Sequence, residues 1–158
     1  MVQAEYHMTA IVNQSMSGRR FVKQDQMTPE SNRLLVAVYG TLKRGLVNHH
    51  LLSRAHFLGE DCMHAITLYD LGPYPGAKAE QSQGIDVEVY AITPAELEQL
   101  DELEDFRAEA PDQGEYTRVL FDTVYGAAWI YLYNPDVSHK PVQRRGSWQP
   151  DSLIGQSA

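Results

Sequence analysis

The sequence predicts an α+β fold, a compact mixed or barrel-like β-sheet with flanking helices. The first observation is the order of the expected elements, which runs strand, helix, extended run, strand, helix, strand, strand. This order differs from the regular alternation of strands and helices in a doubly wound parallel sheet. The second observation is the length of 158 residues, which suits one domain with a sizeable core.

The domain is expected to occupy residues 33–150. Residues 1–32 mix Gln, Ser, Asn, Met and scattered charge with no helix or strand period, which is typical of a loosely ordered N-terminal extension. The first strand is predicted at residues 34–38, because LLVAV is apolar throughout, as in a strand that is buried on both faces. Residues 151–158 are expected to form a C-terminal tail.

The spacing of apolar residues predicts the elements that follow. A helix is expected at residues 46–55, where leucine and valine side chains recur at helical spacing. An extended run is expected at residues 56–72, ending in the turn GPYPG. Residues 84–92, GIDVEVYAI, alternate polar and apolar side chains, which indicates a strand with one solvated face.

The clearest signal is that of a second helix. Thr93 is suited to be its N-cap, Pro94 to be its first residue, and Glu96 to complete a capping box, so the helix is predicted from Pro94 to about Glu104. The chain then passes through a polar loop. Residues 118–134 are rich in Val, Tyr, Trp and Ile and predict two further strands.

The last two strands are expected to join near Asp122 and Thr123. From Pro135 onward the chain contains three prolines and little periodicity, so it is expected to be mostly irregular. The single cysteine, Cys62, excludes an intrachain disulfide and a thiolate metal cluster, and we expect it to be a small buried hydrophobe.

Charge and hydropathy exclude several classes of partner. The formal net charge of −8 argues against sequence-independent binding of a nucleic acid, which needs concentrated Lys and Arg. The sequence has no apolar run of about 18 residues and no signal-peptide pattern, so we expect neither a membrane span nor secretion. A small-molecule or protein partner and a cytoplasmic location are therefore expected.

An acidic residue lies on the apolar face of the second helix. At about 100° per residue, Leu97, Leu100 and Leu103 share one face, and Glu104 lies within roughly 40° of its centre. Partial burial and the helix dipole would raise the pKa of this carboxyl, which suits general acid/base chemistry. The alternative is that Glu104 is solvated on a frayed last turn or paired with Arg107.

A glycine turn follows the first strand. Gly40 allows the backbone to turn tightly, and the amides of Gly40, Thr41 and Leu42 could then donate hydrogen bonds to a carboxylate or carbonyl oxygen in a cavity. The stretch YGTLKRG lacks the spacing of a phosphate-binding loop. The alternative is a plain turn between a strand and a helix.

Five motifs occur in order between residues 34 and 133: VYGTLKRG at 38–45, NHHLL at 48–52, LYDLGPYPG at 68–76, LDELEDF at 100–106 and EYTRVLF at 115–121. Together they resemble the γ-glutamylcyclotransferase-like (AIG2-like) superfamily, and its γ-glutamylamine cyclotransferase branch in particular. The resemblance implies the corresponding fold. It also implies an enzyme that converts a γ-glutamyl amide to 5-oxoproline and a free amine, without a metal or an organic cofactor.

The resemblance also implies roles for individual residues. Glu104 would be the catalytic general acid/base. The binding loop for the γ-glutamyl group would be formed by Tyr39, Gly40, Thr41 and Leu42. Tyr116 would donate its hydroxyl to the bound group, or it would be an ordinary strand aromatic.

Other interpretations of the same residues remain open. The chain could be a non-catalytic binding or regulatory module on this fold, or a cyclotransferase that acts on a γ-glutamyl group of a larger substrate. The acidic loop from Asp105 to Gly114 could reshape the mouth of the pocket. Arg118 is expected to pair with an acid such as Asp101 rather than touch the substrate.

Overall fold

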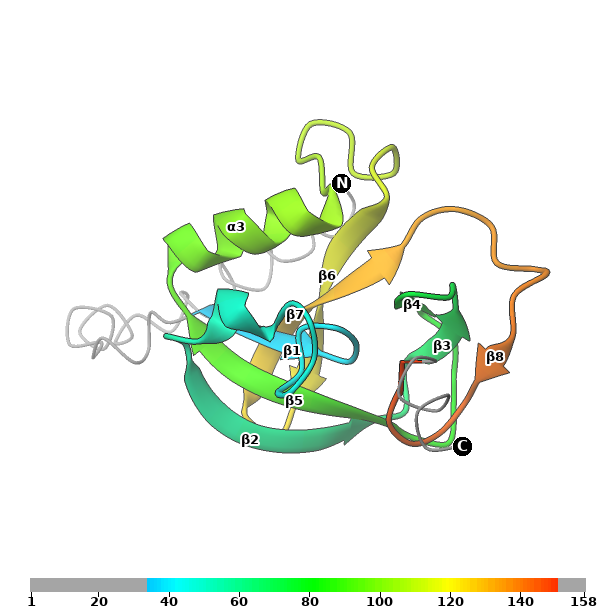
Figure 1. The fold of residues 1–158 in the computed structure, drawn as a ribbon, viewed down its shortest axis with the longest axis horizontal. Coiled ribbons are helices and arrows are strands. Elements are labelled where there is room, and N and C mark those ends of the chain that lie inside the picture. Colours follow the sequence, from blue (N-terminus) through cyan, green and yellow to red (C-terminus); the bar gives the residue numbers. More distant parts are fainter. Residues whose placement is uncertain (1–33, 151–158) are drawn as a thin grey trace, which may run out of the picture. The chain divides into compact units, whose positions relative to one another are not determined.

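The computed structural model describes residues 34–150 (Figure 1). The predicted extension at residues 1–32 and the predicted tail at residues 151–158 lie outside the described residues. Within the described range, no helix has the length and apolar character needed to cross a membrane. Nor do three His, Cys, Asp or Glu side chains of this range come together in an arrangement that could hold a metal ion.

A mixed five-stranded sheet forms the larger part of the fold. Its spatial order is β2-β5-β1-β7-β6. Strand β1 pairs antiparallel with β5 on one side and parallel with β7 on the other, so the predicted mixed sheet is confirmed. The strands are β1 (Leu34–Val38), β2 (His56–Met63), β5 (Ile85–Ile92), β6 (Tyr116–Thr123) and β7 (Gly126–Tyr133).

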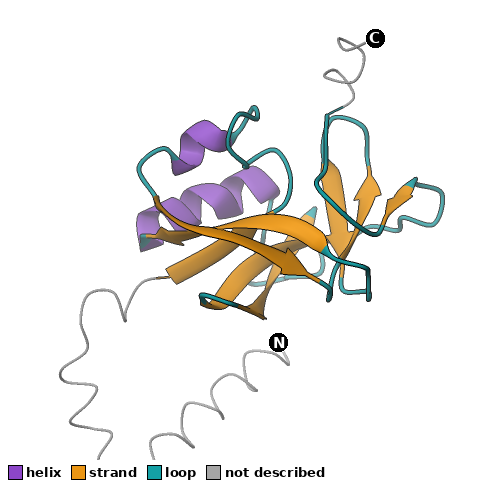
Figure 2. Ribbon diagram, turned by 90° about the horizontal axis from the view of Figure 1, so that it is seen from below, coloured by secondary structure: helices purple, strands orange, loops and turns teal. Residues whose placement is uncertain are grey.

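A smaller sheet of order β4-β3-β8 lies beside the first, as Figure 2 shows. Its strands are β3 (Thr67–Asp70), β4 (Pro75–Lys78) and β8 (Val142–Gln143). The hydroxyl of Tyr39 joins the two sheets, because it donates to the carbonyl of Tyr131 in β7 at 2.7 Å and accepts from the amide of Ala77 in β4 at 3.2 Å. Strand β4 is thereby held against the end of β1.

The helix α3 (Pro94–Glu104) has the predicted bounds. The predicted capping box is present, since the Thr93 hydroxyl accepts from the Glu96 amide at 3.1 Å and the Glu96 carboxylate accepts from the Thr93 amide at 2.9 Å. Leu97 and Leu100 are buried against one face of the larger sheet. Leu103, predicted to share their apolar face, is instead 39% exposed.

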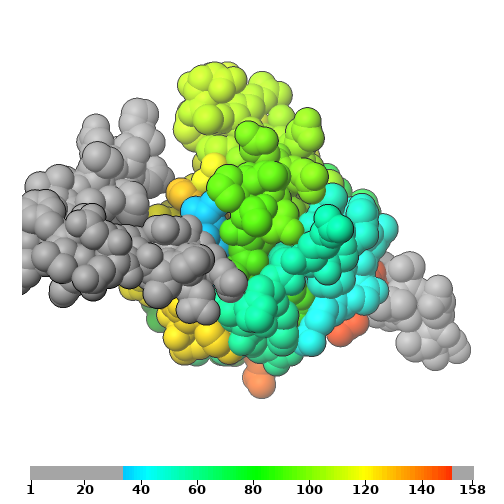
Figure 3. Space-filling model, turned by 90° about the vertical axis from the view of Figure 1, so that its left-hand side faces the viewer, coloured from blue at the N-terminus to red at the C-terminus, as the bar shows by residue number. Residues whose placement is uncertain are grey.

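The prediction of a helix at residues 46–55 is wrong. Only His49–Leu52 is helical, as the 3-10 helix η2. The preceding residues form successive turns, closed by hydrogen bonds from the amide of residue i+3 to the carbonyl of residue i. Val47, which was expected on the apolar face, is 74% exposed. Without a continuous apolar face a short helix gains little from tertiary packing. The short η2 still packs against α3, and the two lie side by side on the surface in Figure 3.

Three further expectations need correction. The predicted extended run at residues 56–72 divides into β2 and β3, which belong to different sheets. The turn between β6 and β7 is at Val124 and Tyr125, just beyond the predicted position. Cys62 is exposed rather than buried, because it lies on the edge strand β2, where its neighbour Met63 takes the inward position.

Candidate active site

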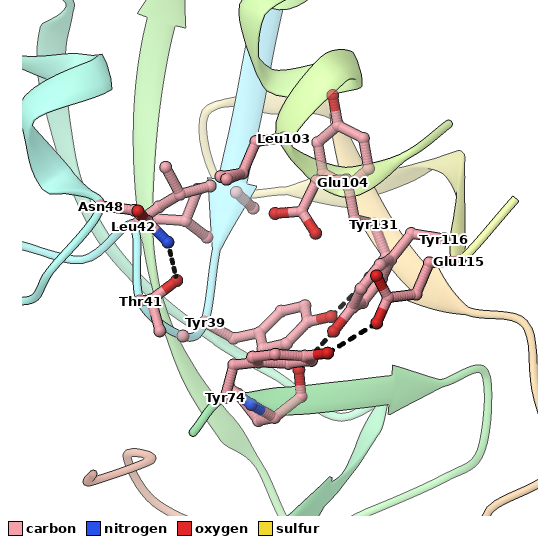
Figure 4. A pocket seen from close by; sticks show the side chains of 14 residues that line it. Tyr39, Thr41, Leu42, Asn48, Tyr74, Leu103, Glu104, Glu115, Tyr116 and Tyr131 are labelled. Atoms are coloured by element: carbon pink, nitrogen blue, oxygen red, sulfur yellow. Dashed lines mark hydrogen bonds between the residues drawn. The ribbon is translucent and has the colours of Figure 1, made fainter. Parts of the chain in front are cut away.

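A cavity of about 180 Å³ opens where the end of β1, the end of α3, the start of β4 and the start of β6 meet (Figure 4). The structure brings all six predicted site residues to its wall. They come from three distant parts of the chain and are Tyr39, Gly40, Thr41, Leu42, Glu104 and Tyr116.

The turn after β1 forms one side of this cavity. Within residues 34–150, the backbone amides of Gly40, Thr41 and Leu42 donate no hydrogen bond. The ring of Pro75 lies so close to Gly40 that a Cβ there would approach it to 2.8 Å. The turn therefore requires glycine for close packing, and its amides are available as donors.

Asn48, the N-cap of η2, and His49 of η2 hold this turn in place. The Asn48 side chain donates to the Thr41 hydroxyl at 2.9 Å, and the Asn48 amide donates to the Thr41 carbonyl at 2.9 Å. His49 Nδ1 lies 2.9 Å from the Leu42 carbonyl, a contact that requires the hydrogen on Nδ1. These bonds occupy the carbonyls of Thr41 and Leu42 and leave the amides of the turn without a partner in the described range.

The two predicted tyrosines contribute rings to the cavity, while their hydroxyl protons are engaged elsewhere. The Tyr39 hydroxyl donates to the Tyr131 carbonyl, and the Tyr116 hydroxyl donates to the Pro75 carbonyl at 2.9 Å. Burial raises the pKa of both phenols well above the usual range. In this arrangement each tyrosine hydroxyl lacks a second proton to donate to a bound molecule.

Glu104 ends α3 and directs its carboxyl into the cavity (Figure 4). Burial, followed by the nearby negative charge of Glu115, raises the pKa of Glu104 from 4.5 to about 8. Among the described residues its carboxyl has no hydrogen-bonding or ion-pair partner. Arg107, the alternative partner considered from the sequence, instead pairs with Asp105 at 3.2 Å.

A bidentate ion pair fixes the orientation of α3. Arg118 of β6 donates to the two carboxylate oxygens of Asp101 at 2.8 and 3.1 Å, which confirms the predicted pair. The Tyr131 hydroxyl donates to the same carboxylate at 2.6 Å. Asp101 precedes Glu104 by three residues, so it lies on a neighbouring part of the same helix surface. The bonds from β6 and β7 therefore turn the end of α3 toward the cavity.

Sequence reasoning missed a second carboxyl in this cavity, that of Glu115. The Tyr74 hydroxyl donates to Glu115 Oε2 at 2.7 Å, and this bond is the main cause that raises the pKa of Tyr74 to about 12. The sequence feature that could have identified Glu115 was the presence of an acidic residue directly before the Tyr-x-Arg strand. Asn48, Leu103 and Tyr131 also line the cavity without having been predicted.

The loop between α3 and β6 is anchored at both ends. The Asp105 carboxylate accepts from the Glu115 amide at 3.0 Å. The Asn134 side chain donates to the carbonyls of Pro111 and Gly114, each at 2.9 Å. The predicted acidic loop is therefore attached to the strands that carry the cavity wall.

Comparison with known proteins places the chain in a family. The family model described as "Gamma-glutamyl cyclotransferase, AIG2-like" matches residues 36–150. The γ-glutamylcyclotransferase family protein YtfP of Escherichia coli strain K12 is 37% identical over 113 residues, covering 72% of this chain and 94% of that protein. The γ-L-glutamyl-butirosin B γ-glutamyl cyclotransferase of Niallia circulans is 33% identical over 109 residues, covering 63% of this chain and 66% of that protein.

Solved structures show the same fold. The solution structure of ytfP from Escherichia coli aligns with a TM-score of 0.59 at 36% identity, covering 75% of this chain and 99% of that one. The crystal structure of an AIG2-like protein from Mus musculus aligns with a TM-score of 0.58 at 23% identity, covering 74% and 88%. The predicted α+β fold and the family resemblance are confirmed. This chain belongs to the γ-glutamyl cyclotransferase, AIG2-like family and is a γ-glutamylcyclotransferase-like enzyme.

Proposed function

We propose that this enzyme converts a γ-glutamyl amide to 5-oxoproline and a free amine, with Glu104 as the general acid/base. One observation supports this proposal above the others. The carboxyl of Glu104, with a pKa raised to about 8, lines the same small cavity as Gly40, Thr41 and Leu42, whose backbone amides donate no hydrogen bond within the described range. A proton acceptor and a set of oxyanion donors are the two components that cyclotransfer requires.

The proposed reaction exchanges the amide C–N bond for the C–N bond of the ring. Once the α-amine of the substrate is neutral, its nitrogen attacks the γ-carbonyl carbon and forms the ring C–N bond. The Glu104 carboxylate accepts the proton that this nitrogen loses. Glu104 then returns the proton to the departing nitrogen as the original amide C–N bond breaks, and the carboxylate is regenerated.

The remaining parts of the cavity would bind and orient the substrate. The free amides of Gly40, Thr41 and Leu42 would donate to the γ-carbonyl oxygen, where negative charge develops. The rings of Tyr39 and Tyr116 would hold the γ-glutamyl chain in its folded conformation. Ring closure is intramolecular, so holding this conformation supplies much of the acceleration.

The test is release of 5-oxoproline from γ-glutamyl-ε-lysine, γ-glutamyl amino acids, glutathione and a γ-glutamyl aminoglycoside. The aminoglycoside represents larger substrates, such as the one in the name of the Niallia circulans relative. Glu104→Gln keeps the size of the side chain and removes the acid. Glu102→Gln is the matched control, since Glu102 lies on α3 and is exposed.

We expect release by the wild type and by Glu102→Gln, and a loss of about a hundredfold or more in kcat for Glu104→Gln. Equal rates for the wild type and Glu104→Gln would contradict the assigned role. If no substrate yields 5-oxoproline while 5-oxoproline itself binds, the chain is a non-catalytic binding module.

A further inference from the structure

We infer that Asn48 positions the Thr41 hydroxyl as a hydrogen-bond donor for the α-carboxylate of the γ-glutamyl group, and that this pair makes the cavity selective for ligands with that carboxylate. The inference rests on the proposed function, because it names the part of the γ-glutamyl substrate that this side of the cavity binds. It gives a role to Asn48, which was not among the predicted site residues.

The hydroxyl groups of the cavity provide the first argument. Five of the lining residues carry a hydroxyl, and they are Tyr39, Thr41, Tyr74, Tyr116 and Tyr131. Each of the four tyrosine hydroxyls donates its proton to a carbonyl or a carboxylate of the protein. Within residues 34–150, the Thr41 hydroxyl donates no hydrogen bond, so its proton is available to a ligand.

Asn48 determines the direction of that proton. Its side chain donates from Nδ2 to Thr41 Oγ1 at 2.9 Å, as Figure 4 shows, so the hydroxyl hydrogen has to point in another direction. The backbone amide of Asn48 also donates to the Thr41 carbonyl at 2.9 Å, which holds the same two residues together independently of the Asn48 side chain. Both residues line the cavity, where a bound molecule can meet the free hydrogen.

The charges around the cavity provide the second argument. None of the lining residues, all within the described range, is Lys, Arg or His, so an α-carboxylate has to be bound by neutral donors. Glu104 is largely protonated at neutral pH because its pKa is about 8. Figure 4 shows Thr41 and Asn48 on one side of the cavity and Glu115 on the other. A carboxylate bound at Thr41 is therefore separated from the charge of Glu115, and its own charge strengthens the hydrogen bond that it accepts.

The experiment compares two ligands that share one lactam ring. 5-Oxoproline carries the carboxylate in question, and 2-pyrrolidinone is the same ring without it. The ratio of their affinities, measured by calorimetry, reports what the carboxylate contributes, whichever amine leaves in the reaction. The proteins are the wild type, Thr41→Val, Thr41→Ser and Asn48→Ala. Val47→Ala is the control, because Val47 directly precedes Asn48, is 74% exposed and does not line the cavity.

We expect the wild type to bind 5-oxoproline more tightly than 2-pyrrolidinone by about tenfold or more, since hydrogen bonds to charged groups are the stronger ones. Thr41→Val keeps the shape of the side chain without the hydroxyl and should lose most of this preference. Thr41→Ser, which restores a hydroxyl, and Val47→Ala should retain it. The affinity for 2-pyrrolidinone should be the same in all variants, which shows that the cavity is intact.

A double substitution tests the positioning role of Asn48. Asn48→Ala frees the Thr41 hydroxyl to rotate and should lower the ratio of affinities by about threefold to tenfold. In the Thr41→Val background, Asn48→Ala should have no further effect, because the two residues act through one hydroxyl. Asn48→Asp keeps the size of the side chain and should also lower the ratio, since its carboxylate accepts the Thr41 proton.

Three results would overturn the inference. A wild-type ratio near one would mean that the cavity does not recognise the carboxylate. A wild-type ratio in Thr41→Val would mean that other groups bind it. Losses that add in the double variant would mean that Asn48 does not act through Thr41.

The same measurements separate this inference from the proposed function. If no γ-glutamyl amide yields 5-oxoproline but the ratio of affinities depends on Thr41 and Asn48, the recognition of the carboxylate stands and the cyclotransfer fails. If 5-oxoproline is released while the ratio is near one, the cyclotransfer stands and this inference fails. If neither ligand binds and no amide reacts, both are overturned.

Discussion

Asp105 Oδ2 accepts a hydrogen bond from the backbone amide of Glu115 at 3.0 Å, so the residue that follows α3 is tied directly to the residue that precedes β6. Asp105 adopts the left-handed conformation, with φ 56° and ψ 47°. Its carbonyl lies where a Cβ of Gly114 would be, so the close approach of the two segments requires glycine. This bond joins the two chain segments that carry the cavity carboxyls, Glu104 and Glu115.

The bond predicts the behaviour of two substitutions at Asp105. Asp105→Gly accepts the left-handed conformation but loses the carboxylate, and Asp105→Asn keeps both the tolerance for this conformation and an acceptor. We expect kcat/KM to fall about tenfold or more in Asp105→Gly, since small displacements of reacting groups are costly, and to change little in Asp105→Asn. Steady-state kinetics measure both. Equal activity in the two variants would mean that the hydrogen bond does not position the site.

The pH dependence of catalysis should follow the pKa of Glu104. If the ionised carboxylate is the base, kcat/KM rises with pH through about 8. The negative charge of Glu115 contributes to this raised pKa, so Glu115→Gln should move the rise to lower pH. The measurement is a profile of kcat/KM between about pH 6 and 9 with a neutral amide substrate. A rise that stays at the wild-type pH would contradict the coupling between the two carboxyls.

The raised pKa of Glu104 also predicts a cost in stability. A carboxyl whose pKa rises from 4.5 to about 8 on folding binds its proton more tightly in the folded state, so its contribution to stability declines as pH rises between these values. Glu104→Gln removes this decline. We expect the variant to exceed the wild type in free energy of unfolding by more than about 1 kcal/mol above pH 8, and by less near pH 5.

Urea unfolding at several pH values measures this difference. Glu102→Gln is the control, because an exposed carboxyl on the same helix should show no such pH-dependent gain. A gain for Glu104→Gln that is the same at all pH values would mean that its pKa is not raised by folding.

Close packing at Gly40 predicts a further effect. In Gly40→Ala the new methyl group would lie 2.8 Å from the Pro75 ring, so either the turn or the start of β4 must shift. We expect a loss of about 1–3 kcal/mol in free energy of unfolding, as for other overpacked sites, together with a large loss of kcat.

Gly45→Ala is the matched control in the same loop. Its φ of +84° makes alanine strained, but no atom lies within 4 Å of the new methyl group. We expect a stability loss of about 1–2 kcal/mol from this backbone strain, with kcat retained. If both variants keep kcat, the shape of the turn at Gly40 is not needed for catalysis.

The sequence predicted features that depend on neighbouring residues better than features that depend on residues distant in the chain. The bounds of α3 were predicted correctly because its N-cap, first-turn proline and capping acid act within one turn of the helix. The residues around His49 were predicted as a longer helix, since leucine spacing alone does not show whether a partner surface exists. Leu103 was expected in the core for the same reason, but it lies at the cavity, where α3 ends.

The sequence by itself determined the turn at Gly40, the helix α3 and the presence of an acid on its inner face, because each depends on neighbouring residues and on helical periodicity. Only the tertiary structure decided which groups meet around that acid. Tyr74 and Glu115 are 41 residues apart, and the hydroxyls of Tyr39 and Tyr116 find carbonyl partners on other strands. Such contacts depend on the pairing order of the strands and on the position of β4, which no local pattern encodes.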